Sequence, residues 1–322
     1  MMKYSYFPGC SMDSTAVTYK KSFEFVADKI GLELLEIPDW NCCGSTAAHT
    51  KNEKMALALA ARNIALSEEA NPGLDIVTPC AACYSRLAFS SHKARSSEET
   101  RKEMEEILEM NFKAEPEIRN LLDLFSDPEV KEACEKKMVR SLKGLKAACY
   151  YGCLMSRPRK ITGEEDPENP MKMDRIIEMT GAEAIDWDLK TECCGASHQV
   201  DAPKQARPLI EKIFRNARAN GADVIVTACP LCNMNLDMRE EEINKKLSHP
   251  YNIPVYQFTE LLAIAMGAGA GQSGIHQHFF PAFDPMNKVI QANWEEEKRK
   301  AKEEAKKNPL ADGPIIIGKA GK

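Results

Sequence analysis

Five cysteines recur twice in this chain, in the same order. The first set contains Cys10, Cys42, Cys43, Cys80 and Cys83, and the second contains Cys153, Cys193, Cys194, Cys229 and Cys232. In both sets the middle pair is vicinal and is followed by glycine, Gly44 or Gly195. Side chains of neighbouring strand residues face opposite ways, so a vicinal pair can address one object only where the chain turns, and glycine allows such a turn. Each copy therefore predicts a turn that aims two thiols at one target.

Composition restricts what these thiols can do. The chain has 322 residues, 43% of them hydrophobic, which is enough for two domains with their own cores. A net charge of -5 and a pI near 5.8 argue against nucleic acid as a partner. Residues 1–10 lack the pattern of a signal peptide, and the most apolar run, residues 261–270, is too short to span a membrane. We therefore expect a cytoplasmic protein, in which twelve cysteines favour metal binding or redox chemistry over disulfides.

Apolar runs and helical patterns alternate along both copies. Strands are expected at residues 3–7, 32–37 and 74–78 and again at 147–151, 183–187 and 223–227, with helices at 15–30, 51–71, from 81, 171–180 and 203–220. This order predicts an α/β fold with two pseudo-symmetric, Rossmann-like domains, each with a small parallel sheet. Ligands of such sheets bind beyond the carboxyl ends of the strands. Because each cysteine group follows an expected strand, the five thiols of one copy should gather at one sheet edge.

The predicted domain organisation has four parts. They are a first cysteine-rich domain at 1–95, a helical connector at 96–146, a second cysteine-rich domain at 147–266 and a C-terminal extension at 267–322. Residues 84–146 are highly charged and are expected to be mainly helical, as is the charged stretch 293–308. Residues 309–322 are expected to be a loosely ordered terminus, although the apolar run 315–317 could pair with a partner's sheet edge. Residues 276–283 are rich in Phe and His, which fits ordinary packing, a cover over the second site or a partner contact.

Several cofactors could use cysteines in this pattern. Structural zinc takes four ligands, commonly as two pairs, and leaves a fifth thiol unused. A redox CxxC pair explains only Cys80 with Cys83 or Cys229 with Cys232. Iron–sulfur clusters use thiolates, and a surplus thiolate can bridge two irons. We therefore expect iron–sulfur clusters, with zinc in one copy as the main alternative.

The spacings carry a family resemblance. Cys10-x31-Cys42-Cys43-x36-Cys80-x2-Cys83 and Cys153-x39-Cys193-Cys194-x34-Cys229-x2-Cys232 resemble two CCG signatures, and over residues 3–265 the chain resembles the B-type subunit of heterodisulfide reductase. The resemblance implies two non-cubane [4Fe-4S] clusters, one held by each set of five cysteines, facing one another across the substrate. The tail beyond about residue 290 is longer than this family's core and points to an extra partner or a subfamily.

The same resemblance implies a reaction. It would be the two-electron reduction of a mixed disulfide to two small thiols, coenzyme M and coenzyme B in methanogens and their methanogenesis. Electrons would come from an iron–sulfur partner like the C-type subunit of the reductase, fed by a flavin subunit or a membrane cytochrome. The chain has no glycine-rich nucleotide fingerprint, so we expect no flavin in it. The alternatives are an electron-transfer subunit of a sulfur-oxidation or quinone-linked dehydrogenase complex, and a zinc-stabilised scaffold.

Other residues near the cysteines are candidates for supporting roles. His49 and His198 follow the vicinal pairs and could donate protons, although each could equally be a hydrogen-bonded loop histidine. Cations that could attract anionic coenzymes, or could be ordinary surface charges, are Lys51, Arg86, Arg157, Arg159, Lys204 and Arg207. Cys134 and Cys149 lie outside both sets and are expected to be an ordinary helix cysteine and a core thiol, respectively.

Overall fold

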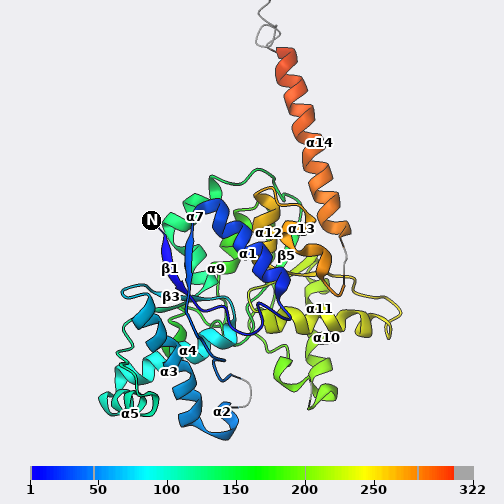
Figure 1. The fold of residues 1–322 in the computed structure, drawn as a ribbon. Helices are drawn as coiled ribbons and strands as arrows, with labels where there is room; N and C mark the ends of the chain where they lie inside the picture. The colour runs from blue at the N-terminus through cyan, green and yellow to red at the C-terminus, as the bar shows by residue number, and fades with distance from the viewer. Residues whose placement is uncertain (1, 46–47, 200, 281–282, 308–322) are drawn as a thin grey trace, which may run out of the picture.

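A computed structural model describes residues 2–45, 48–199, 201–280 and 283–307, and these form two four-stranded parallel sheets (Figure 1). The strand order is β2-β1-β3-β4 in one sheet and β6-β5-β7-β8 in the other. The predicted α/β architecture with two pseudo-symmetric domains is confirmed. The strands are β1 (Lys3–Tyr6), β2 (Glu33–Glu36), β3 (Ile76–Thr78), β4 (Ile118–Asn120), β5 (Lys146–Tyr150), β6 (Glu183–Ala184), β7 (Val224–Thr227) and β8 (Val255–Gln257).

Helices connect the parallel strands in the same order in both copies. They are α1 (Val17–Ile30), α3 (Glu53–Ala70) and α4 (Ala81–Ser96) in the first copy, and α9 (Lys172–Glu178), α10 (Pro203–Ala219) and α11 (Pro230–Asn244) in the second. The first strand of each copy lies between its second and third strands. The chain therefore winds in opposite directions from β1 and from β5, and a doubly wound sheet leaves its ligand crevice at that point.

The fourth strand of each sheet is absent from the sequence prediction. The stretch 84–146, expected to be mainly helical, contains β4 between α5 (Glu98–Leu108) and the helices α6 (Leu121–Ser126) and α7 (Pro128–Glu135). β4 pairs in parallel with β3, and β8 pairs likewise with β7. Three residues are too few to produce a recognisable period, which is why the pattern did not reveal these strands. The expected strand at 183–187 is shorter, since β6 covers only Glu183–Ala184.

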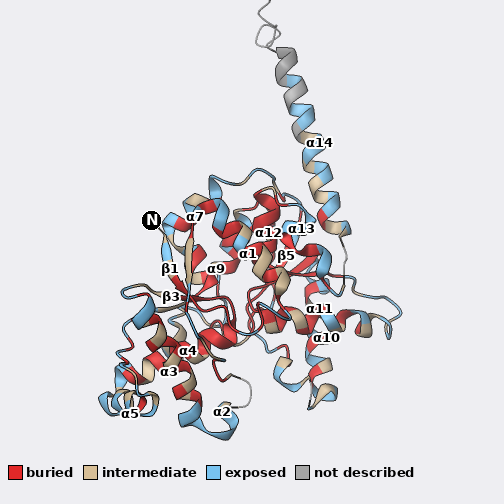
Figure 2. Ribbon diagram, viewed as in Figure 1, coloured by how far each residue is buried: buried red, intermediate tan, exposed pale blue. Residues whose placement is uncertain are grey.

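Helices from both copies form one shared core between the sheets. α1 packs against α12 (Phe258–Ala265), and α6 packs against α9. The Phe258 ring lies edge-on to Phe125 of α6, with centroids 5.4 Å apart, and to Tyr19 of α1 at 6.2 Å. Figure 2 shows the buried residues concentrated where α1, α12 and β5 meet. Each fully buried aromatic ring contributes about 1.5–3 kcal/mol, so this core holds the two sheets in a fixed relation.

The remaining elements lie at the edges. They are α2 (Ala48–Lys51), α8 (Arg159–Thr162), α13 (Ala270–Ser273), α14 (Asp284–Lys307) and the 3₁₀ turns η1 (Ala196–His198) and η2 (Ile275–Gln277). α14 projects away from the body (Figure 1) and contains residues 293–307 of the charged helix expected at 293–308, and this helix begins earlier than predicted. The predicted terminus at 309–322, with its run 315–317, lies outside the described residues. Among the described helices, none has the length and apolar character needed to cross a membrane.

His278 anchors the segment that leads to α14. Its ring nitrogens lie 3.1 Å from an Asp237 carboxylate oxygen of α11 and 2.9 Å from a Glu260 carboxylate oxygen of α12, and all three side chains are buried. Burial opposes a charge on His278, but the two carboxylates outweigh burial and raise the pKa of His278 to about 10. Within the predicted Phe- and His-rich segment 276–283, His278 is therefore packed in the core. Residues 281–282 of this segment lie outside the described residues.

The buried His278 predicts a dependence of stability on pH. A raised pKa in the folded state stabilises the protein fully below the unfolded pKa of about 6.5, and this contribution is lost as pH rises toward about 10. We expect the free energy of unfolding to fall over this range, measured by denaturant titration at several pH values. His278→Gln should flatten the decline.

A matched control separates this effect from other titrations. His276→Gln removes an exposed histidine two positions away, whose Nδ1 lies 2.8 Å from the Ala270 carbonyl oxygen, and should keep the wild-type slope. Glu240, whose pKa burial raises to about 8, contributes a decline of the same sign in all three proteins. Equal slopes in the wild type and His278→Gln would contradict the assignment.

Candidate metal centre

The CxxC motifs lie at the carboxyl ends of β3 and β7. Cys80 and Cys229 have extended backbone conformations and are the N-cap residues of α4 and α11. Residues three apart in a helix share a face, so Cys83 and Cys232 return to the same side as the first cysteine of each motif. All four thiols are buried. In each copy the end of the strand and the start of the helix that follows it thus present two thiols to the edge of the sheet, as the sequence predicted.

The lone cysteine of each set follows a glycine that packs directly on a thiol. Gly9 has a φ of 71° and Gly152 a φ of 68°, in the left-handed region that favours glycine. A Cβ on Gly9 would lie 2.9 Å from the Cys83 sulfur, and a Cβ on Gly152 would lie 3.1 Å from the Cys232 sulfur. Only a residue without a side chain lets the backbone approach so closely. The sequence did not predict this role, although a Gly-Cys pair follows the first strand of both copies.

The vicinal pairs turn as predicted. Gly44 and Gly195 have φ values of 79° and 77°, and in each pair the second thiol is buried while the first is exposed. In the second copy the Tyr150 hydroxyl donates to the Glu192 carbonyl oxygen at 2.5 Å, which holds the chain just before Cys193. Each turn therefore directs one thiol into the protein and leaves the other at the rim.

Thiol contacts bring the ten predicted cysteines together. The contacts within the sets are Cys10 with Cys42, Cys42 with Cys43, Cys43 with Cys83, Cys80 with Cys83, Cys153 with Cys193, Cys194 with Cys232 and Cys229 with Cys232. The Cys194 and Cys232 sulfurs are 3.5 Å apart. One contact, between Cys80 and Cys229, joins the two sets. Within the described ranges no three His, Cys, Asp or Glu side chains converge on the position of a single metal ion, so the thiols form chains of contacts and do not surround one point.

Contacts between thiols shift the pKa values of the two partners in opposite directions. The hydrogen bond with Cys83 lowers the pKa of Cys43 to about 7, and the hydrogen bond with Cys153 lowers the pKa of Cys193 to about 6. The hydrogen bond between Cys194 and Cys232 likewise lowers the pKa of Cys194. The same contacts raise the pKa values of the partner thiols Cys83, Cys153 and Cys232. Both copies therefore contain thiols that favour the thiolate form, which is the form that binds metals.

The contact between the sets breaks their symmetry. The hydrogen bond with Cys229 lowers the pKa of Cys80. The hydrogen bond with Cys232 lowers the pKa of Cys229. The hydrogen bond with Cys80 and burial outweigh this effect and raise the pKa of Cys229 to about 12. A buried Tyr19 of α1 lies beside this contact, and its hydroxyl donates to the Ala228 carbonyl oxygen at 3.4 Å. Tyr19 thus ties a helix of the first copy to the loop that carries Cys229.

The predicted histidines lie at the rim. His49 is exposed on α2, and His198 is exposed on η1, 3.8 Å from the Asp201 carboxylate. The charge of His198 acts on Cys193 and contributes to its lowered pKa. Of the two histidines, His198 is therefore the one with an electrostatic effect on a cysteine of its set.

The predicted cations differ in their exposure and in whether a carboxylate already pairs with them. Arg157 donates to the Thr191 side chain at 3.0 Å and pairs with Glu168, while Arg207 pairs with Glu242 at 2.7 Å. Lys51 and Lys204 are exposed, and Arg159 begins α8. Arg86 is half-buried, and its charge acts on Cys43.

The two cysteines outside the sets lie in the core, as predicted. Cys134 is buried on α7 and Cys149 on β5. Burial raises the pKa of Cys134 to about 12 and also raises that of Cys149, so both stay protonated thiols.

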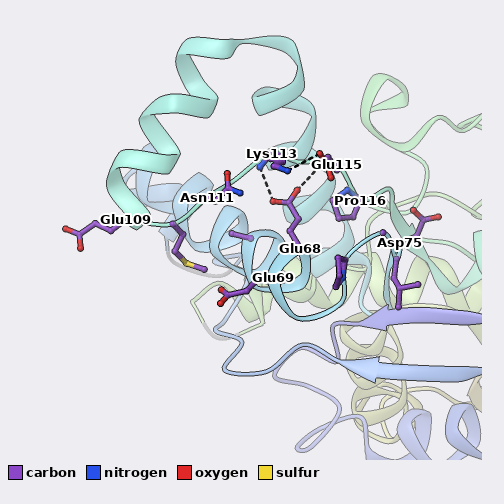
Figure 3. A pocket seen from close by; sticks show the side chains of 13 residues that line it. Glu68, Glu69, Asp75, Glu109, Asn111, Lys113, Glu115 and Pro116 are labelled. Carbon is purple, nitrogen blue, oxygen red and sulfur yellow. Dashed lines mark hydrogen bonds and ion pairs between the residues drawn. The ribbon is translucent and has the colours of Figure 1, made fainter.

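A surface pocket of about 570 Å³ lies elsewhere (Figure 3). Its lining includes Glu68, which accepts from the backbone N–H groups of Lys113 at 3.0 Å and Glu115 at 2.8 Å. Residues 73–75 of the lining precede β3, whereas the cysteines follow it. The pocket therefore opens at the opposite edge of the first sheet from the thiols.

The glycine contacts predict the effect of adding one methyl group. Gly152→Ala should displace the Cys232 sulfur and lower the iron and sulfide bound per chain in protein purified without oxygen. Gly73→Ala is the matched control, because Gly73 has a φ of 76° but nothing within 4 Å of an added Cβ. Both variants lose about 1–2 kcal/mol of stability to backbone strain. Equal iron content in the two variants would contradict a specific role for the Gly152 contact.

Comparisons with known proteins agree with this geometry. The model of the CCG cysteine-rich domain matches residues 4–88 and 147–237. The chain is 30% identical to the 8-methylmenaquinol:fumarate reductase membrane anchor subunit of Wolinella succinogenes, over 87% of this chain and 98% of that protein. It is also 30% identical to the B-type subunit of the ferredoxin/F420H2-dependent CoB-CoM heterodisulfide reductase of Methanosarcina acetivorans, over 90% of this chain and 98% of that one.

A solved structure shares the fold. A hypothetical protein from Helicobacter pylori superimposes with a TM-score of 0.68 at 12% identity, over 86% of this chain and 52% of that chain. The matched cysteine-rich regions coincide with the two thiol sets of the structure. The chain belongs to the CCG cysteine-rich domain family and is a homologue of the B-type subunit of heterodisulfide reductase.

Proposed function

We propose that this protein is the disulfide-reducing subunit of a heterodisulfide reductase-type oxidoreductase, with one non-cubane [4Fe-4S] cluster at each set of five cysteines. The observation that carries the proposal is the contact between Cys80 and Cys229, because it joins the two sets in one buried place. The relatives named as B-type subunits of CoB-CoM heterodisulfide reductases support the same activity. The substrate class would be a mixed disulfide of two small thiols.

The residues present fit such clusters. Each set offers five sulfur donors, and thiolates are the usual ligands of iron–sulfur clusters. Gly9 and Gly152 provide cradles that a Cβ would fill, beside Cys83 and Cys232. Zinc at one set remains the minor alternative, since four of five thiols would satisfy it. When bound, a pair of clusters could supply the two electrons of disulfide reduction, one from each.

The chain's own residues would prepare the site. Tyr19 and the shared core hold the two CxxC loops next to one another, and burial of the four CxxC thiols keeps water from them. The exposed Cys42 and Cys193 mark the rim from which a small disulfide would enter. Electrons would come from an iron–sulfur partner subunit, in turn supplied by a flavin subunit or a membrane cytochrome. The relatives are themselves named as subunits, which supports a multi-subunit assembly.

Cys194→Ser tests the pairing of the two sets. It should lose or convert the second cluster and abolish disulfide reduction, while the first cluster and its signal in electron paramagnetic resonance remain. The measurements are iron, sulfide and zinc per chain, with about eight irons expected in the wild type, and reduction of a mixed disulfide by an artificial donor.

The control is Cys134→Ala, which removes a buried cysteine outside both sets and should keep both clusters. A wild-type chain that binds no iron, or full activity in Cys194→Ser, would overturn the proposal. A zinc-containing, colourless wild type would indicate a scaffold instead.

A second candidate function is electron transfer without a disulfide substrate. It is favoured by the 30% identity to a subunit of an 8-methylmenaquinol:fumarate reductase, which is named for other substrates. Adding a small thiol such as coenzyme M to the oxidised protein discriminates the two. A new thiol-dependent paramagnetic signal supports disulfide chemistry, whereas an unchanged signal supports electron transfer alone.

His198 is the proposed proton donor, because its charge acts on Cys193 at the rim of the second set. His198→Gln should lower the turnover of disulfide reduction while the iron content stays at its wild-type value. His49→Gln tests the equivalent rim of the first set, and His249→Gln, at another exposed position, is the control. Unchanged turnover in His198→Gln would remove this residue from the mechanism.

A further inference from the structure

The two thiol sets differ at one equivalent position. Three residues after the second cysteine of each CxxC motif, the first copy has Arg86 and the second has Asn235. Both lie on the helix that the motif begins, α4 or α11. Because residues three apart share a helix face, each lies on the face of its CxxC thiol, Cys83 or Cys232. These thiols contact the buried members of the vicinal pairs, Cys43 and Cys194. Positions 86 and 235 therefore occupy equivalent places in the two sites.

Asn235 brings a neutral amide to the second set. It is buried, with 2% of its surface exposed, and its Nδ2 donates to the Cys194 carbonyl oxygen at 2.8 Å. Its Oδ1 has no hydrogen-bond partner among the described residues. The amide therefore fixes the turn and touches Cys194, but adds no net charge.

Arg86 brings a full positive charge to the first set. It is half-buried, and its guanidinium acts electrostatically on Cys43, the counterpart of Cys194. No carboxylate in the described part of the chain forms an ion pair with Arg86. At the second set, by contrast, the nearby Arg207 is neutralised by Glu242 at 2.7 Å. The first set thus has an unpaired cation that acts on its buried thiol Cys43, whereas the cation that acts on the second set, His198, acts on the exposed rim thiol Cys193.

A second difference between the copies does not change the charge. Phe7 lies beneath Gly9 where Tyr150 lies beneath Gly152. The Tyr150 hydroxyl is used by its bond to the Glu192 carbonyl oxygen, so it acts as a clamp on the loop. The pair at positions 86 and 235 is therefore the difference that bears on charge at the buried thiols Cys43 and Cys194.

We propose that Arg86 and Asn235 make the two metal centres unequal, so that the centre at the first cysteine set is reduced at the higher potential. A nearby cation stabilises an added electron, and side chains around metal ligands tune the metal in this way. The inference rests on the proposed function only in requiring iron–sulfur clusters at both sets. In consequence the first centre holds an electron more tightly and the second is the stronger reductant.

The experiment is a redox titration of the anaerobically purified full chain, followed by electron paramagnetic resonance. The signal that survives in Cys194→Ser belongs to the first centre. At the wild-type midpoint potential of the first centre, Arg86→Asn should lower the ratio of reduced to oxidised centre about tenfold. For a one-electron couple this corresponds to a fall in reduction potential of about 59 mV. The second centre should not move.

Three variants complete the test. Arg86→Lys keeps the charge and should retain the wild-type ratio, and Lys93→Gln removes a cation from the last turn of the same helix without effect. Asn235→Asp, close to Asn in shape, should lower the potential of the second centre alone. Iron at both sets with an unmoved first centre in Arg86→Asn, or an equal shift in Arg86→Lys, would overturn this inference alone. Absence of iron from the wild type would overturn the proposed function, and this inference with it.

Discussion

The packing of α1 against α12, and of α6 against α9, is the constraint on which the rest of the molecule depends. Each copy alone directs five thiols to one sheet edge, but that edge faces the other copy only because Tyr19, Phe125 and Phe258 are buried in one shared core. The hydrogen bond from Tyr19 to the Ala228 carbonyl oxygen extends this core to the thiols. Without it, Cys80 and Cys229 would belong to two separate sites instead of one.

The thiol geometry is more than that of a lone cysteine motif. A lone CxxC redox motif has no use for Gly9 and Gly152, which pack beside Cys83 and Cys232. The same geometry serves disulfide reduction and electron transfer alike, so the choice between them depends on what reaches the rim at Cys42 and Cys193. The two cysteine-rich regions are thus shared with the family, whereas a substrate is decided by the surroundings of a site.

Much of this arrangement could be predicted because it is local in sequence. The vicinal turns follow from Gly44 and Gly195, and the CxxC positions follow from the strands before them. β4 and β8 could not be predicted, because three-residue strands are stabilised by their neighbours rather than by their own pattern. The burial of His278 could not be predicted from the sequence either, because its partners Asp237 and Glu260 come from other helices. Contacts between the copies, such as that of Cys80 with Cys229, require the tertiary arrangement itself.

The shared core also has a consequence for how such a chain can be divided. If the duplication were undone, either half-chain would expose the aromatic rings that the other half now covers, around Phe125 or Phe258. Exposed apolar patches of this kind drive association, so a half would survive only as a pair that rebuilds the same contact. Fusion of the copies removes that concentration dependence and lets each half diverge in charge while its register with the other is kept.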